Sequence, residues 1–86
     1  MKELERALKA FANGRRLAIV KYLKWRSKAT VGEIARAIRL SFKSTSRHLT
    51  LLAFAEVVER NQVNIQAWYS LKKKQSLAAR SIINIL

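Results

Sequence analysis

The chain has 86 residues, of which 18 are Lys or Arg and five are Asp or Glu, so its formal net charge is +13. This length fits one domain with a small core, and a hydrophobic content of 50% argues against disorder. The sequence has no cysteine, which excludes disulfides, thiolate metal sites and cysteine nucleophiles.

The excess of positive charge favours a polyanionic partner, because each phosphate that a cation neutralises releases condensed counterions. Nucleic acid is the leading candidate; a basic protein of an unusual cell interior and a ribosome-associated domain are the alternatives. No apolar run approaches the roughly 18 residues of a membrane-spanning helix, and the N-terminal residues show no export signal. We therefore expect a cytoplasmic protein with no membrane partner.

Two amphipathic helices are predicted in the first third of the chain. Residues 3–12 carry one apolar stripe, and their cations lie off it. A second helix is expected from Gly14 to about Trp25, with Asn13 as its N-cap. Its aromatic residues, Tyr22 and Trp25, could stack on a nucleic-acid base, although aromatics at helical spacing more often belong to a core. Residues 27–29 are interpreted as a short basic connector.

A pair of short helices joined by a tight turn comes next. Thr30 and Glu33 form a capping box at the start of the first helix. Ser41 is a good N-cap for the second, predicted over about 41–54. One face of this second helix is apolar or small and is formed by Phe42, Thr45, Leu49 and Leu52. The pattern indicates a helix-turn-helix whose second helix reads DNA; because no glycine marks the turn, a plain helical hairpin is the alternative.

The opposite face of the helix at 41–54 carries short hydroxyls and long cations. Its members are Lys43, Ser44, Ser46, Arg47 and Thr50. Hydroxyls can bond phosphates or base edges, and arginine can bond guanine through two parallel hydrogen bonds. This face therefore suits the major groove of double-stranded DNA, with an ordinary solvated surface as the alternative.

The region about 57–70 is the only one with β character. Its β-branched and aromatic residues are Val57, Val58, Trp68 and Tyr69. Asparagines between them form turns readily, so a two-stranded hairpin is predicted, and it must pack on the helices because an isolated hairpin is marginal. Its tip would project as a wing on which Arg60 and Gln62 are candidate DNA contacts; a purely structural hairpin is the alternative.

The last predicted helix covers about 72–86 and has a broad apolar surface. This surface either folds back on the core or pairs with another chain. A membrane-surface helix is a competing interpretation, because cations beside an apolar face also bind anionic lipid. Arg80 interrupts the second half of the face, which favours packing against protein.

The order of helix, helix, helix-turn-helix, wing and helix resembles the ArsR-type winged-helix transcriptional regulators. The segment LKAFANGRRLAIV at 8–20 resembles that family's opening segment, and VGEIA at 31–35 resembles its next helix. Residues 40–52 resemble the reading helix, with Leu-Ser at the start and Ser-Arg-His-Leu inside it. Residues 57–59 and 68–71 resemble the two wing strands, so the resemblance covers nearly the full length.

The resemblance implies a homodimer joined mainly through the first and last helices. The interface residues would be Leu4, Leu8, Leu77, Ile82 and Ile85. It also implies that exposed residues of 42–50 enter the major groove and that the wing touches flanking DNA. The matching contact positions are Lys43, Ser44, Ser46 and Arg47, while His48 is either a further contact or a packing residue.

Departures from the family pattern bear on cofactors and on local geometry. Many members sense metal through cysteines in the third helix or through His and acidic pairs on the last helix. Residues 31–38 hold no cysteine and the last helix holds no His, Asp or Glu, so we predict no metal and no cofactor. Phe42 stands where a polar reading residue is common and could instead staple the helix to the core. Ala55-Glu56 replaces the family's glycine before the first wing strand, and Asn64 replaces the glycine at the wing tip.

We predict a mainly α fold with a small β-hairpin, a winged helix-turn-helix of order α-α-α-α-β-β-α, in one domain spanning residues 1–86. The predicted function is a sequence-specific double-stranded-DNA-binding regulator, acting as a dimeric repressor. A winged-helix protein-interaction module and a non-specific architectural or RNA-binding protein are the alternatives. One His, no Cys, no Asp and five scattered Glu offer no evident catalytic pair, so no enzyme is predicted.

Overall fold

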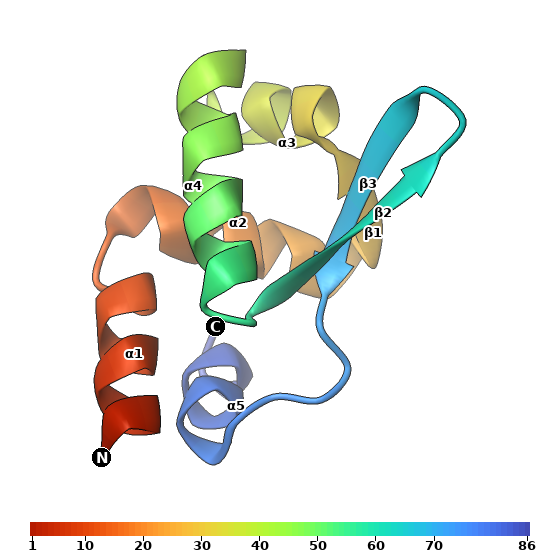
Figure 1. The fold of residues 1–86 in the computed structure, drawn as a ribbon. Coiled ribbons are helices and arrows are strands. Elements are labelled where there is room, and N and C mark those ends of the chain that lie inside the picture. Colours follow the sequence, from red (N-terminus) through yellow and green to blue (C-terminus); the bar gives the residue numbers. More distant parts are fainter.

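Five helices and a three-stranded antiparallel sheet make up the structure, a computed structural model that describes all residues 1–86 (Figure 1). In chain order the elements are α1 (Lys2–Phe11), α2 (Gly14–Arg26), β1 (Lys28–Thr30), α3 (Val31–Ile38), α4 (Phe42–Phe54), β2 (Val58–Val63), β3 (Gln66–Leu71) and α5 (Leu77–Asn84). This mainly helical architecture with a projecting hairpin confirms the predicted winged helix-turn-helix. No helix combines the length and the apolar character that crossing a membrane requires.

Side-chain caps begin α2, α3, α4 and α5, because the first N–H groups of a helix have no partner inside it. The Asn13 side chain accepts hydrogen bonds from the backbone of Arg15 and Arg16, and the Ser41 hydroxyl accepts one from Ser44 at 3.1 Å. Both bonds of the capping box between Thr30 and Glu33 are present. The three N-caps predicted from the sequence are therefore confirmed.

The turn between α3 and α4 is tight although it contains no glycine. Arg39 takes the left-handed conformation, with φ 57° and ψ 51°, and the backbone N–H of Leu40 donates to the carbonyl of Ala35 at 3.0 Å. Glu56 (φ 62°) and Asn64 (φ 57°) adopt positive φ at the other two positions where the family pattern has glycine. Each of these three residues therefore carries a backbone strain of about 1–2 kcal/mol that a glycine at the same position would avoid.

The sheet holds one strand that the sequence analysis did not predict. Residues 27–29 were interpreted as a connector, but Lys28–Thr30 pairs antiparallel with β3, and the strand order is β1-β3-β2. Three residues are too few to show a period of two, so the strand leaves no pattern in the sequence. The predicted hairpin is confirmed, and its strands pair from Val58 opposite Leu71 to Val63 opposite Gln66.

The core lies where the inner faces of α2, α3 and α4 meet the sheet. On α4, Thr45, Leu49 and Leu52 are fully buried, as predicted for its apolar face. The Thr45 hydroxyl has no hydrogen-bond partner there, so this one polar atom is buried at a cost in free energy. The helix α4 is therefore fixed to the body of the protein by three side chains on one face.

Two aromatic residues that the sequence placed in or against the core are exposed in the structure. Phe42 was placed on the apolar face of α4, but its side chain is 63% exposed, because the first turn of the helix extends beyond the core. Trp25 is also exposed, at the end of α2, whereas Tyr22 packs partly against the core. The staple role considered for Phe42 and the core role favoured for Trp25 are therefore wrong.

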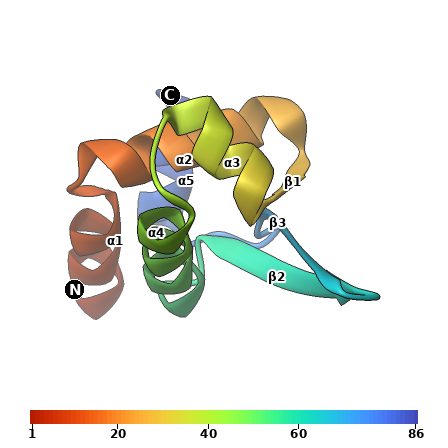
Figure 2. The ribbon, with the colours of Figure 1, turned by 90° about the horizontal axis from the view of Figure 1, so that it is seen from above.

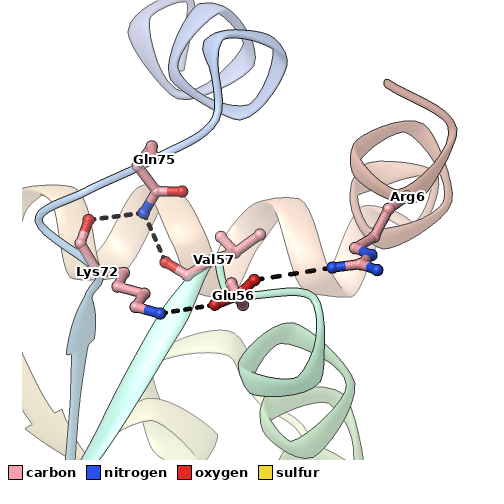
Figure 3. A network of polar contacts seen from close by, with 5 residues as sticks. All are labelled: Arg6, Glu56, Val57, Lys72 and Gln75. Carbon is pink, nitrogen blue, oxygen red and sulfur yellow. Dashed lines mark hydrogen bonds and ion pairs between the residues drawn. The ribbon is translucent and has the colours of Figure 1, made fainter. Parts of the chain in front are cut away.

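The last helix is shorter than the predicted 72–86, because the segment before it is held in a loop. The Gln75 side-chain amide donates to the carbonyl of Val57 at 2.8 Å and to that of Lys72 at 2.7 Å (Figure 3). Ser76 then caps α5 by accepting a hydrogen bond from Ala79 at 3.1 Å. Ala79 and Ile83 are buried, so one face of α5 folds back on α1 and α2.

A charged network joins α1 to the corner between α4 and β2. Glu56 accepts a hydrogen bond from the Lys72 ammonium at 2.9 Å, and its other oxygen lies 3.7 Å from the Arg6 guanidinium (Figure 3). The Lys72 hydrogen bond and charge, with help from Arg6, lower the pKa of Glu56 below its usual value. Arg6 and Glu56 are more than half exposed and Lys72 is partly exposed, so solvent screens the charges and the network orients the corner more than it stabilises the fold.

Candidate nucleic-acid interface

The outward face of α4 forms a continuous stripe of cations and hydroxyls. Lys43, Arg47 and Thr50 are exposed and recur at i, i+4 and i+7, which places them along one side of the helix. Ser44 and Ser46 flank this stripe and are half-buried. The structure thus brings together all five hydroxyl and cationic residues that the sequence predicted for this face.

The two cations of the stripe have no charged partner in the chain. None of the ion pairs includes Lys43 or Arg47, and α4 carries no acidic residue. Glu5, Glu33 and Glu56 are paired with cations elsewhere. A face with unpaired cations and no acid has a positive potential, which attracts phosphates.

Hydroxyl groups on α4 differ in what they can offer a ligand. The Thr50 hydroxyl donates to the Ser46 carbonyl at 3.0 Å, which occupies its one donor inside the helix. Its oxygen can still accept a hydrogen bond. Ser44 and Ser46 have no such side-chain bond and keep both capacities, so they are better placed to bond phosphates.

The wing holds a second group of polar residues. The Arg60 guanidinium donates to the Gln62 side-chain oxygen at 2.8 Å, and the Gln62 amide donates to the Asn64 carbonyl at 3.1 Å. Arg60 pairs across the strands with Tyr69, whose side chain is buried, so Arg60 and Gln62 lie on the side of the sheet that faces the helices. Figure 2 shows the hairpin extending beyond the helical body, which allows this group to reach a ligand that also contacts α4.

His48 connects α4 to the first two helices through Arg16. The Arg16 guanidinium lies 3.3 Å from Nδ1 of His48 and donates to the carbonyls of Ala10 at 2.7 Å and Lys9 at 3.2 Å. A guanidinium can only donate, so Nδ1 is the acceptor and the proton of neutral His48 is on Nε2. The sequence left open whether His48 packs or contacts DNA; the structure shows a packing bond through Nδ1 and leaves Nε2–H as its donor.

Stability should fall between neutral and mildly acidic pH because of His48. Its burial, and then the charges of Arg16 and Arg15, lower its pKa below the ordinary value. Below about pH 6.5 the unfolded chain therefore binds a proton that the folded protein resists, so the free energy of unfolding decreases as pH falls. Urea unfolding at about pH 7.5 and about pH 5.5 measures this decrease, and His48→Gln should reduce it.

Few other groups should contribute to the difference in unfolding free energy between these two pH values. His48 is the single histidine of the chain, and the acids with shifted values, Glu33 and Glu56, have a lowered pKa and titrate below 4.5. A wild-type stability that is equal at the two pH values, or an unchanged slope in His48→Gln, would contradict the role given to the bond between Arg16 and His48.

Arg16 is a residue of this region that the sequence analysis did not single out. It is 32 residues away from His48 in the chain, and the helical periodicity of α2 does not indicate a contact between them. Its three hydrogen bonds tie the end of α1 to α4. The orientation of α4 therefore depends on α1 as well as on the core.

A face formed by α1 and α5 carries exposed apolar side chains. Leu77 and Ile85 are 81% and 82% exposed, and Leu4 and Leu8 are exposed as well. Met1, Leu4 and Leu77 line a shallow groove between the two helices. Ile82, also predicted at the interface, is partly buried and packs against the core of its own chain.

No group of three or more His, Cys, Asp or Glu side chains comes close enough together to hold a metal ion. The polar surface described above is instead built of cations, hydroxyls and amides. These groups bind phosphates and base edges.

A helix-turn-helix with unpaired cations on its second helix, followed by a wing with further polar side chains, defines a DNA-binding transcription regulator. The family model described as the arsR family of bacterial regulatory proteins matches residues 13–60, which include α2, the helix-turn-helix and the start of the wing. The chain belongs to this family, and its likeness to the ArsR-type regulators is thereby confirmed.

Solved structures similar to this chain are regulators of the same type. HlyU from Vibrio cholerae is 28% identical, with a TM-score of 0.83 over 98% of this chain and 87% of that one. The transcriptional repressor PagR of Bacillus anthracis is 25% identical, with a TM-score of 0.81 over 98% and 92%. The homodimeric winged helix-turn-helix DNA-binding domain of Mb0332 from Mycobacterium bovis is 26% identical, with a TM-score of 0.79 over 98% and 71%. No curated protein sequence matches the chain.

Proposed function

We propose that the protein is a homodimeric repressor that binds a specific sequence of double-stranded DNA. The observation that carries this proposal is the outward stripe of α4, where Lys43 and Arg47 are exposed and unpaired while the opposite face is fully buried. A helix held rigidly on one side and open on the other can enter the major groove without reorganisation.

Each part of the interface has a separate task in this proposal. Arg47 reads a base edge, since a guanidinium matches the two acceptors of guanine. The DNA backbone or neighbouring base edges are bonded by Lys43, Ser44, Ser46 and Thr50. The Nε2–H group of His48 is a further hydrogen-bond donor. Arg60 and Gln62 bond the flanking DNA from the wing.

The dimer is supported by the apolar face of α1 and α5. Leu4, Leu8, Leu77 and Ile85 leave an exposed patch that a second copy would cover, with Ile82 supporting it from beneath. Mb0332, which has a similar fold, is described as homodimeric. Two reading helices related by a two-fold axis would lie about 34 Å apart and contact successive major grooves.

Repression would follow from occlusion of the promoter in the cytoplasm, without a cofactor or a metal. PagR, which shares the fold over almost its whole length, is described as a transcriptional repressor. A dimer bound across two major grooves leaves no room for polymerase on the same segment of DNA.

Selection of bound duplexes from a random pool, followed by salt titration, tests the proposal. We expect a palindromic consensus and an affinity that falls by orders of magnitude between about 50 and 200 mM salt, because several phosphates are neutralised. No binding to any duplex at low salt would contradict DNA binding. Equal affinity for the selected and a scrambled duplex would favour a non-specific architectural protein instead.

A further inference from the structure

The C-terminal end of α4 carries an apolar patch that the proposed DNA interface does not use. Leu51 is 52% exposed and Phe54 is 84% exposed. Together with Ala10 and Ala55 they line a groove of about 510 Å³ between α1 and α4, which we call the α1–α4 groove. Figures 1 and 2 both show α1 beside α4, on the side of the molecule away from the wing.

Cations surround the apolar floor of the α1–α4 groove. Its rim is formed by Lys2, Arg6, Lys9 and Arg16, with Glu5 as the one acid. Two of these cations have acidic neighbours, since Lys9 lies 3.6 Å from Glu5 and Arg6 lies 3.7 Å from Glu56. Both pairs are solvent-exposed and therefore weak, so the rim remains positive and available to a stronger anionic partner.

The groove is separate from the proposed dimer face. On α1 the rim residues Lys2, Arg6 and Lys9 follow the spacing i, i+4, i+7 and form one stripe. Leu4 and Leu8 belong to a different stripe, and no residue of α5 lines the groove. A dimer joined through α1 and α5 would therefore leave the groove open.

The groove is also separate from the part of α4 proposed to read DNA. Phe54 is 11 positions beyond Lys43, a distance of about 16 Å along a helix with a rise of 1.5 Å per residue. A phosphate gains nothing from Leu51 and Phe54, because apolar side chains offer no hydrogen bonds. The composition of the groove suits a ligand that has both apolar and acidic groups.

We propose that the α1–α4 groove binds an acidic amphipathic peptide segment of a partner protein. Its apolar side chains pack on Leu51 and Phe54, and its carboxylates lie against Lys2, Lys9 and Arg6. An amphipathic helix placed in a groove is a common mode of peptide recognition, and the charges of rim and peptide are complementary.

Other occupants fit the groove less well. A second copy would place one cationic rim against another, in a chain that already carries a net charge of +13. An anionic membrane is complementary in charge, but a flat bilayer does not fill a concave groove between two helices. A peptide matches the charge, the apolar floor and the concave shape together.

Binding of a designed peptide tests the inference. The probe is a fluorescein-labelled peptide of about 12 residues, rich in glutamate, with Leu and Phe spaced i and i+4. Anisotropy titrations with the full-length protein should show saturable binding. Two comparison peptides, one with lysine in place of glutamate and one with serine in place of Leu and Phe, should bind at least about tenfold more weakly.

Matched variants of the protein locate the binding site. Phe54→Ser should weaken peptide binding by about tenfold or more, whereas Phe42→Ser, the same change at an exposed position of the same helix, should not. The double variant Lys2→Gln with Lys9→Gln should also weaken peptide binding. The control double variant Lys21→Gln with Lys73→Gln removes the same charge outside the groove and should not. Both phenylalanines are largely exposed, so thermal unfolding should change little in either variant.

Four results would overturn the inference. The first is equal binding of the acidic peptide that lacks apolar residues, and the second is unchanged binding to Phe54→Ser. The third is self-association of the protein in the absence of peptide, if Phe54→Ser abolishes it, because the groove would then bind a second copy of the chain. The fourth is binding to phosphatidylserine vesicles that depends on Phe54 while the peptide does not bind. Unchanged affinity of Phe54→Ser for duplex DNA would support a site distinct from the DNA interface.

Discussion

Replacing both Leu77 and Ile85 with glutamine should turn the proposed dimer into a monomer and lower the affinity for a palindromic operator by about 10²–10⁴-fold. In a dimer, binding of the first half-site makes binding of the second an intramolecular step, and this advantage disappears in a monomer. Both side chains are more than four-fifths exposed in the single chain, so their replacement should change its own stability little. Glutamine is neutral, so the charge that attracts DNA stays the same.

Sedimentation equilibrium and titrations on full-site and half-site duplexes measure these effects separately. The double variant should bind a half-site as tightly as one wild-type protomer does, which separates loss of the dimer from damage to the reading helix. Ile65→Gln, at a still more exposed apolar position in the turn between β2 and β3, should remain dimeric. A double variant that stays dimeric would show that the face on α1 and α5 is wrongly assigned, and a monomeric wild type would contradict the dimer itself.

Local chemistry made most of the fold predictable from the sequence. The caps at Asn13, Thr30 and Ser41 depend on residues within three positions of one another, and the faces of α1 and α4 follow from helical spacing. The strand β1 and the start of α5 depend instead on distant partners. Lys28–Thr30 becomes a strand because β3 passes beside it, and Gln75 ends the loop before α5 by bonding to Val57.

In the candidate site, too, the features set by local sequence were predictable and those set by contacts between distant residues were not. The stripe of Lys43, Arg47 and Thr50 repeats with the period of a helix and could be predicted. The link between Arg16 and His48 could not, because its two residues meet only in the folded chain. The α1–α4 groove was missed for a related reason: Leu51 and Phe54 fit the expected composition of a helix, and only the structure shows that nothing covers them.

Arg47→Ala should lower the affinity for the selected operator by about 1–3 kcal/mol and remove the preference for one base pair in each half-site. The guanidinium is exposed and has no ion-pair partner in the chain, so its hydrogen-bonding groups are available to the two acceptors of a guanine. Because α4 is anchored by Leu49 and Leu52 on the opposite face, the substitution should leave the fold intact.

Arg47→Lys separates base reading from simple attraction of phosphate. Lysine keeps the charge but lacks the planar fork, so it should restore the salt dependence of binding without restoring the base preference. Titrations of wild type and both variants on the operator and on a duplex with that base pair exchanged measure this difference. If Arg47→Lys kept full discrimination, the planar fork would not be what reads the base. If Arg47→Ala lost affinity equally on both duplexes, Arg47 would be a phosphate contact. If Arg47→Ala bound both duplexes as the wild type does, the reading role would belong to another residue of α4.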